Sequence, residues 1–268
     1  MTKREAKNKK VVLILVDGMR ADAVEKCGHP FVKEVRKNSF FRLDAGTVMP
    51  SITLPCHMSL FHSVPPERHG TMTNVYVPQA RPVKGIFDSL TDQGKVCASV
   101  YNWEELRDLG RPGSLQYSFF INEYHYTKTD RMVADKAVDC MAKYRPDFLF
   151  VYLGVTDTKG HDYGWMTEEY MESVYGAWNC IEYMVKEWNQ EYVFIITADH
   201  GGHGRNHGEN IPEDMTIPII ITGGGMEKKD ELAVQPNILD IAPTIAGLMD
   251  TVPEKLWEGR DLLKKNNV

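Results

Sequence analysis

The sequence predicts an α/β protein, a three-layer sandwich in which helices cover both faces of a mostly parallel sheet. Two observations support this fold class. Short apolar runs rich in β-branched residues recur along the chain, as expected of strands buried on both faces. Stretches with helical spacing of apolar residues separate these runs, and strands that alternate with helices are typical of parallel sheets.

The predicted elements follow one another in a regular order. A basic, polar stretch, residues 1–10, is expected to be a flexible tail. Strand-like apolar runs then occupy residues 11–16, 95–102, 148–154, 192–198 and 216–223. Helical patterns begin after Pro55 and occupy residues 83–93, 129–144, 167–189 and 237–249.

Residues 71–128 have a different character, with several prolines and glycines, many aromatic residues and weaker periodicity. We expect part of this stretch to form loops over the functional face of the sheet. The chain contains no linker, internal repeat or low-complexity segment, so residues 1–268 are predicted to form a single domain.

Composition limits the classes of function. Of the 268 residues, 43% are hydrophobic and 25% charged, which is ordinary for a globular protein with a full core. The net charge of -6 and the pI near 5.9 argue against binding of a nucleic-acid polymer through a basic surface. A small anionic substrate is still compatible with this charge, because a local metal site can override it. The sequence makes no prediction of the oligomeric state.

The cysteines and the first apolar run bear on location. The five cysteines are widely spaced and form no CxxC pair, which argues against a structural zinc site held by cysteines. The run at residues 11–16 is too short for a signal-peptide core or a membrane span. We therefore expect a cytoplasmic protein with reduced thiols and no membrane partner.

Acidic residues follow three of the buried runs. Asp17 ends the first, Asp157 follows the run at 148–154, and Asp199-His200 ends the run at 192–198. Because the carboxyl ends of parallel strands meet at one edge of a sheet, these side chains are expected to converge there. His161 lies four residues after Asp157, so a helical turn would place both on one side.

His207, in the glycine-rich stretch GGHGRNHG, completes a set of three carboxylates and three imidazoles. Such a mixed oxygen and nitrogen set suits Zn²⁺, with Mn²⁺ or iron as alternatives. For single residues, simpler interpretations compete. Asp17 could cap a helix, Asp157 and His161 could be a capping pair, and His203 is a rival to His207.

Six short motifs follow one another along the chain in this order: VDG (16–18), PSITLPCH (50–57), PPERHG (65–70), DTKGH (157–161), DHGG (199–202) and HGENIPEDM (207–215). Together they resemble the alkaline phosphatase superfamily, most closely its nucleotide pyrophosphatase/phosphodiesterase branch. The resemblance covers roughly residues 11–74 and 147–250. It implies an alkaline-phosphatase-like core, here without a large cap domain.

The resemblance also implies two zinc ions. Asp157, His161 and His207 would hold the first ion, and Asp17, Asp199 and His200 the second, with Thr53 completing its shell. Thr53 stands where the family has its nucleophile, in a T-x-P-x-H setting, although Ser51 is a local rival. Metal coordination would lower the pKa of its hydroxyl, and Pro55 favours a helix N-terminus whose free N–H groups attract phosphate oxygens.

One position departs from the family pattern. Three residues after the nucleophile, the family typically has an asparagine that holds a phosphate oxygen, whereas this chain has Cys56. A thiol is a weak donor, so Cys56 is only a candidate substrate-binding residue.

The expected activity is hydrolysis of a phosphodiester or pyrophosphate through a covalent phosphothreonine, with a nucleotide-like small molecule as one candidate substrate. A phosphomonoesterase or phosphonate hydrolase is the alternative. A metal-dependent phosphomutase is less favoured, because such mutases carry a large inserted domain. A non-catalytic metal-binding relic is disfavoured by the complete ligand set.

Overall fold

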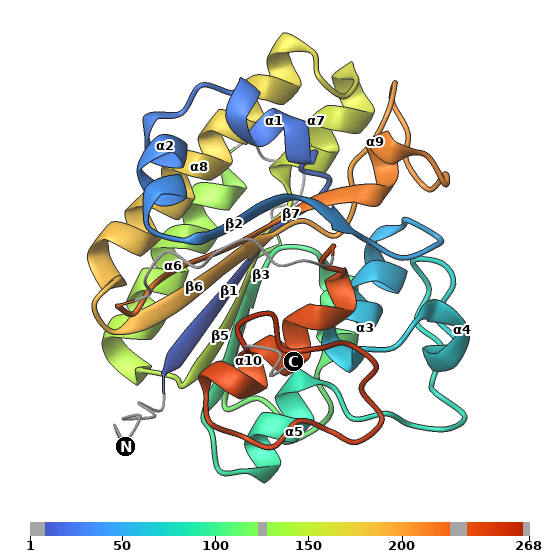
Figure 1. The fold of residues 1–268 in the computed structure, drawn as a ribbon, viewed down its shortest axis with the longest axis vertical. Coiled ribbons are helices and arrows are strands. Elements are labelled where there is room, and N and C mark those ends of the chain that lie inside the picture. Colours follow the sequence, from blue (N-terminus) through green and yellow to red (C-terminus); the bar gives the residue numbers. More distant parts are fainter. Residues whose placement is uncertain (1–8, 123–127, 226–234, 265–268) are drawn as a thin grey trace.

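A computed structural model describes residues 9–122, 128–225 and 235–264. Within these residues the strands form one seven-stranded sheet of order β2-β7-β6-β1-β5-β3-β4, flanked by helices on both faces (Figure 1). The strands are β1 (Lys10–Val16), β2 (Phe40–Gly46), β3 (Cys97–Tyr101), β4 (Tyr117–Phe120), β5 (Phe148–Leu153), β6 (Tyr192–Thr197) and β7 (Thr216–Gly223). The predicted α/β class is confirmed.

One helical layer packs around the long helix α8 (Glu168–Trp188). It contains α1 (Ala21–Lys26), α2 (Pro30–Lys37), α6 (Thr129–Tyr144) and α7 (Val155–Tyr163) (Figure 1). The opposite layer packs around α3 (Thr53–His62). It contains α4 (Pro66–His69), α5 (Ile86–Asp92), η1 (Glu104–Leu109), η2 (Ile238–Asp240) and α10 (Ile241–Leu248). A short helix, α9 (Pro212–Met215), precedes β7.

The centre of the sheet is parallel and fully buried. Strand β1 pairs in parallel with β5 and with β6, and every residue from Val11 to Val16 is fully buried. The continuous apolar run of this strand is thus explained by helices on both faces. Because the three strands end in register, the residues that follow them meet at one edge of the sheet.

The run at residues 216–223 forms the expected buried strand, but it is one of the strands that make the sheet only mostly parallel. Strand β7 pairs antiparallel with both β6 and β2. It is nevertheless buried on both faces, from Ile217 to Thr222. An apolar run therefore reports burial, and burial does not determine strand direction.

One expectation about the chain ends is corrected. Lys10, assigned to the tail, begins β1 and pairs with Tyr192, with its ammonium group over the tyrosine ring. Residues 1–8 of that tail lie outside the described residues. Of the stretch 71–128, residues 123–127 also lie outside, and the remainder includes α5, β3, η1 and β4 besides loops. In the described part of the chain, none of the helices has the length and apolarity needed to cross a membrane.

Candidate active site

An enclosed group of three side chains lies where β1 and β6 end. Asp17, Asp199 and His200 each bring one ligand-capable atom within 4.8 Å of the others, and all three are buried. The N–H of Gly18 donates to Asp199 Oδ1 at 3.1 Å and fixes that carboxylate. His200 Nε2 lies 3.3 Å from Asp17 Oδ1. The expected convergence of the strand ends is thus present, and Asp17 is not a helix cap, since α1 begins only at Ala21.

A second, more open group lies at the end of β5. Asp157 and His161 occupy one face of α7, with His161 Nε2 3.5 Å from Asp157 Oδ1, as their four-residue spacing predicts. His207 joins them from the loop after β6, 3.8 Å from the same oxygen. These three residues also meet within 4.8 Å. The side chain of His161 is 41% exposed, whereas that of His207 is 9% exposed.

His203, the rival to His207, lies elsewhere in the same loop. Its Nδ1 is 2.8 Å from Asp214 Oδ1, and its Nε2 is 3.6 Å from Glu209 Oε1. It belongs to neither group of three.

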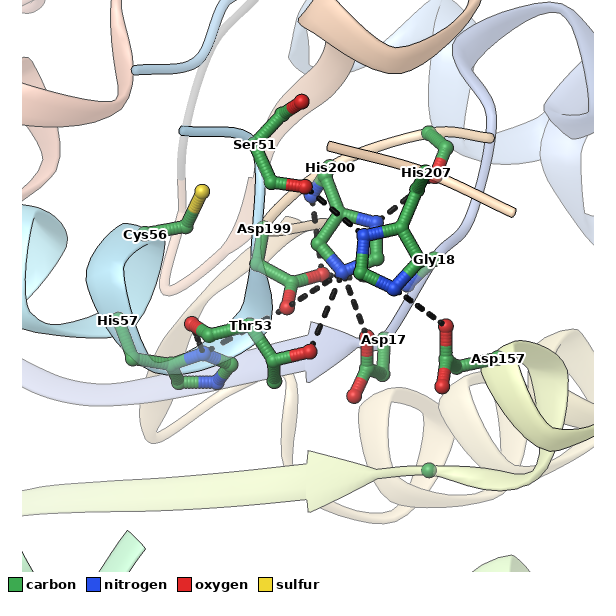
Figure 2. Close-up of polar contacts among 12 residues, drawn as sticks. Asp17, Gly18, Ser51, Thr53, Cys56, His57, Asp157, Asp199, His200 and His207 are labelled. Carbon is green, nitrogen blue, oxygen red and sulfur yellow. Dashed lines mark hydrogen bonds and ion pairs between the residues drawn. The ribbon is translucent and has the colours of Figure 1, made fainter. Parts of the chain in front are cut away.

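Thr53 is the first residue of α3 and faces the enclosed group (Figure 2). Its Oγ1 lies 3.3 Å from His200 Nε2. Every residue of α3 is buried, so the hydroxyl is held on a helix enclosed on all sides. Ser51, the local rival, directs its hydroxyl to the carbonyl of Glu209 at 3.1 Å.

The expectation of several free N–H groups at this helix end needs correction. The N–H of Leu54 donates to Asn74 Oδ1 at 3.0 Å, Pro55 has none, and that of Cys56 bonds to the carbonyl of Ile52. The first turn of α3 is therefore largely satisfied within the protein.

The three imidazoles are all held through the same ring atom, Nδ1. His161, His200 and His207 place Nδ1 against the backbone carbonyls of Arg205, Gly201 and Ser51, at 3.0, 2.7 and 2.8 Å. A carbonyl only accepts, so each Nδ1 carries the proton and each Nε2 presents its lone pair to the site. Metal-binding histidines are held in this way.

The three carboxylates complete the test for metal binding. Asp17 Oδ1, Asp157 Oδ1 and Asp199 Oδ2 are buried and have no hydrogen-bond partner among the described residues. Burial, together with the mutual repulsion of the carboxylates, raises the pKa of Asp17 and of Asp157 well above the usual range. Burial likewise raises the pKa of Asp199 to about 7. Unpartnered oxygens facing free imidazole nitrogens fit two divalent cations, which would keep the carboxylates ionised.

Cys56 has a structural environment. Its thiol is fully buried, 3.4 Å from the hydroxyl of Thr47, and points away from Thr53 and His200 (Figure 2). Burial raises the pKa of the thiol further above its usual value. This position gives no support to a substrate-binding role for Cys56.

The family model for type I phosphodiesterase / nucleotide pyrophosphatase matches residues 11–211, a span that holds every residue of both groups and Thr53. The chain belongs to this family.

Curated relatives of this phosphodiesterase-family chain include GPI ethanolamine phosphate transferase 1 of Yarrowia lipolytica. It is 25% identical over 257 residues, which cover 82% of this chain and 27% of the relative. The phosphopentomutase of Clostridium kluyveri is 28% identical over 131 residues, 48% of this chain and 33% of the relative. The chain thus spans about a quarter to a third of the length of these relatives.

Among solved structures, murine ectonucleotide pyrophosphatase / phosphodiesterase 5, in an inactive form in complex with AMP, superposes with a TM-score of 0.75. The alignment covers 91% of this chain and 96% of that one at 15% identity. At this identity the likeness establishes the alkaline-phosphatase-like fold alone.

Sequence reasoning missed several residues that shape the site of this phosphodiesterase-family chain. The Tyr152 hydroxyl donates to Asp17 Oδ2, and Asn74 Oδ1 accepts from the backbone beside Thr53. Asn102, directly after β3, is 1% exposed, and neither of its amide atoms has a partner among the described residues. A polar residue directly after a buried strand was the available signal for Asn102, as it was for Asp17.

Proposed function

We propose that the protein is a two-metal hydrolase that cleaves a phosphodiester or pyrophosphate bond, with Thr53 as nucleophile. The observation that carries the proposal is the position of the Thr53 hydroxyl, 3.3 Å from His200 Nε2, at the end of the sheet where both candidate metal groups gather. Membership of the type I phosphodiesterase / nucleotide pyrophosphatase family supports it.

Each group in the site has a proposed role. Asp17, Asp199 and His200 hold the ion beside Thr53, and Asp157, His161 and His207 hold the other. Zinc is the proposed metal, since the donors are oxygen and nitrogen without thiolate. When bound, two such ions lower the pKa of the Thr53 hydroxyl and stabilise charge on the attacking and leaving oxygens.

The reaction proposed for Thr53 has two displacements. Its Oγ1 forms a bond to phosphorus as the bond to the leaving oxygen breaks, and the proton lost by the hydroxyl ends on the leaving group. A water oxygen then bonds to phosphorus as the bond to Oγ1 breaks, and one water proton returns to Thr53. The enclosure of α3 holds Oγ1 in place for both in-line steps.

The substrate is proposed to be a small phosphorylated molecule, in part because a structural neighbour is solved with AMP. A nucleotide-like diester is thus the first class to test. The cytoplasmic location expected from the sequence stays a prediction.

Transfer to an acceptor other than water is the second candidate, since the Yarrowia relative bears the name of a phosphate transferase. The same phosphothreonine would serve both outcomes, and the attacking hydroxyl would decide between them. A mutase is the third, on the likeness to phosphopentomutase, which covers under half of this chain.

The test is a paired turnover assay with purified protein reconstituted with Zn²⁺ or with Mn²⁺. A p-nitrophenyl nucleoside diester is compared with p-nitrophenyl phosphate, for wild type, Thr53→Ala and the matched control Thr53→Ser. We expect diester preference, a loss of about 10³-fold or more in Thr53→Ala, and partial retention in Thr53→Ser.

Two readouts separate the candidates. Acid quenching and mass spectrometry should locate a phosphoryl or nucleotidyl group on Thr53. Adding ethanolamine or glycerol should leave the product distribution unchanged for a hydrolase and yield the new ester for a transferase. Unaltered turnover in Thr53→Ala would exclude the covalent route, and monoester preference would reassign the protein as a phosphatase.

A further inference from the structure

Trp165, in the turn between α7 and α8, fits between two glycines that belong to different metal-ligand segments. A Cβ added to Gly160, on α7, would lie 2.6 Å from Trp165 Cε2 and Cζ2. A Cβ added to Gly202, after β6, would lie 2.2 Å from Cε2. Both backbones therefore approach the indole ring to distances that only glycine allows. The residue is 6% exposed.

The polar atoms of Trp165 reach two loops. Its indole Nε1 donates to the carbonyl of Gly18 at 2.9 Å, directly after Asp17. Its backbone N–H donates to the carbonyl of Gly204 at 2.7 Å, in the loop that carries His207. One residue thus contacts all three segments that supply the candidate ligands, those after β1, β5 and β6.

The indole also touches two of the imidazoles. Its ring meets that of His161 edge-on, with centroids 5.1 Å apart and planes at 85°. The His207 ring lies 5.9 Å away at 65°. These are two of the three side chains in the more open group, and such edge-to-face contacts restrict ring rotation.

We propose that Trp165 is a positioning residue that sets the spacing of the Asp157–His161–His207 group and thereby its affinity for a divalent ion. The proposal rests on the proposed function for the identity of the ligands. Trp165 itself touches neither substrate nor reacting atoms. It acts through the imidazoles it packs against and the Gly160 and Gly202 backbones it holds apart.

Ordinary core packing is the competing explanation, and it predicts a different result. A buried tryptophan that serves only the core would, when replaced, lower global stability without selecting one ion. Trp178 on α8 provides that comparison. It is fully buried, its Nε1 has no hydrogen-bond partner among the described residues, and an aromatic neighbour is Phe31.

The experiment compares wild type, Trp165→Phe and Trp178→Phe as full-length proteins. Zn²⁺ stoichiometry and affinity are measured by competition with a chromogenic chelator, and the visible spectrum of bound Co²⁺ reports ligand geometry. We expect one of two ions to bind about ten-fold or more weakly in Trp165→Phe, with an altered Co²⁺ band. Trp178→Phe should bind both ions as the wild type does.

Hydrogen exchange of the metal-free proteins gives a readout that does not depend on any ion. Amides of residues 201–206 should exchange about ten-fold faster or more in Trp165→Phe than in Trp178→Phe, because the loop has lost its support. Gly160→Ala, which pushes the ring from the other side, should reproduce both effects. It replaces Trp165→Phe if that variant fails to fold.

The outcomes separate the two proposals. Two ions bound with wild-type affinity in Trp165→Phe would overturn the positioning role and leave the proposed function intact. A wild type that binds no divalent ion would refute the proposed function. In that case the proposed control of ion affinity by Trp165 would be overturned as well, and exchange at residues 201–206 would report only whether the indole supports the loop.

Discussion

Gly202→Ala is a small perturbation with a large predicted effect. The added methyl carbon would lie 2.2 Å from Cε2 of Trp165, about 1.2 Å short of ordinary contact at 3.4 Å. The indole cannot retreat freely, since Gly160 lies against it and Nε1 is bonded to Gly18. The loop must therefore move by about an ångström, two residues after His200.

Both stability and metal binding should suffer from this displacement. Overpacking of this kind costs roughly 1–3 kcal/mol, which corresponds to a fall in Tm of about 2–12 °C. Metal–ligand distances tolerate only about 0.2 Å, so Zn²⁺ affinity should fall about ten-fold or more.

The assay measures thermal unfolding and chelator competition side by side. Gly176→Ala is the matched control, because a Cβ at Gly176 meets nothing within 4 Å on helix α8. Alanine should stabilise that helix by about 1 kcal/mol and leave zinc binding unchanged. Wild-type Tm and zinc affinity in Gly202→Ala would refute the account of a rigid indole between two loops.

Three further predictions concern groups outside the ligand set. Burial lowers the pKa of His62 to about 4, so its contribution to stability is complete above pH 6.5 and is lost as the pH falls through 4. In His62→Gln, the fall in the free energy of unfolding between pH 7.5 and pH 4.5 should be about 2–3 kcal/mol smaller than in the wild type, as measured by urea unfolding at both pH values. An unchanged fall would contradict the assignment. Burial raises the pKa of Asp130 to about 7, so its contribution is complete below about pH 4 and is lost as the pH rises through 7. Asp130→Asn still accepts from the Val155 N–H. Its free energy of unfolding should exceed that of the wild type by on the order of 1–4 kcal/mol at pH 8 and should be equal to it near pH 4. An equal gain at both pH values would contradict the raised pKa of Asp130. Asn102→Leu should raise the free energy of unfolding by about 1 kcal/mol in denaturant unfolding, because two unpartnered amide atoms leave the interior. A less stable variant would show that the amide has a structural partner.

Buried strands were predictable from the sequence because burial on both faces gives a continuous apolar run. The edge strands were not. Most residues of β2 (FFRLDAG) are only partly buried, and β4 (YSFF) alternates between partly buried and exposed residues, so neither forms such a run. The direction of β7 depends on which strand it pairs with, and its own residues do not specify this.

Some residues of the candidate site could likewise be predicted from the sequence, and others could not. Asp17 and Asp199 could be located because they directly follow buried runs, and Asp157 because it lies soon after one. His200 ends a run, His161 is four residues from Asp157, and the motif resemblance supplied the role of Thr53. Trp165 and Tyr152 could not be assigned to the site from the sequence, since a buried aromatic residue is usually a core residue. Their roles depend on contacts with residues distant in sequence: the Trp165 indole N–H donates to the carbonyl of Gly18, and the Tyr152 hydroxyl donates to Asp17.

The difference in exposure between the two ligand groups has a consequence for metal supply. Asp17, Asp199 and His200 are sealed, whereas His161 is open to solvent. A chelator, or a competing protein, can reach the open group without disturbing the core. Loss of metal is therefore expected to proceed in a fixed order, through a half-loaded form that keeps the ion beside Thr53. Activity would then follow free metal concentration through the weaker binding step, and restoring a single ion would be enough to recover it.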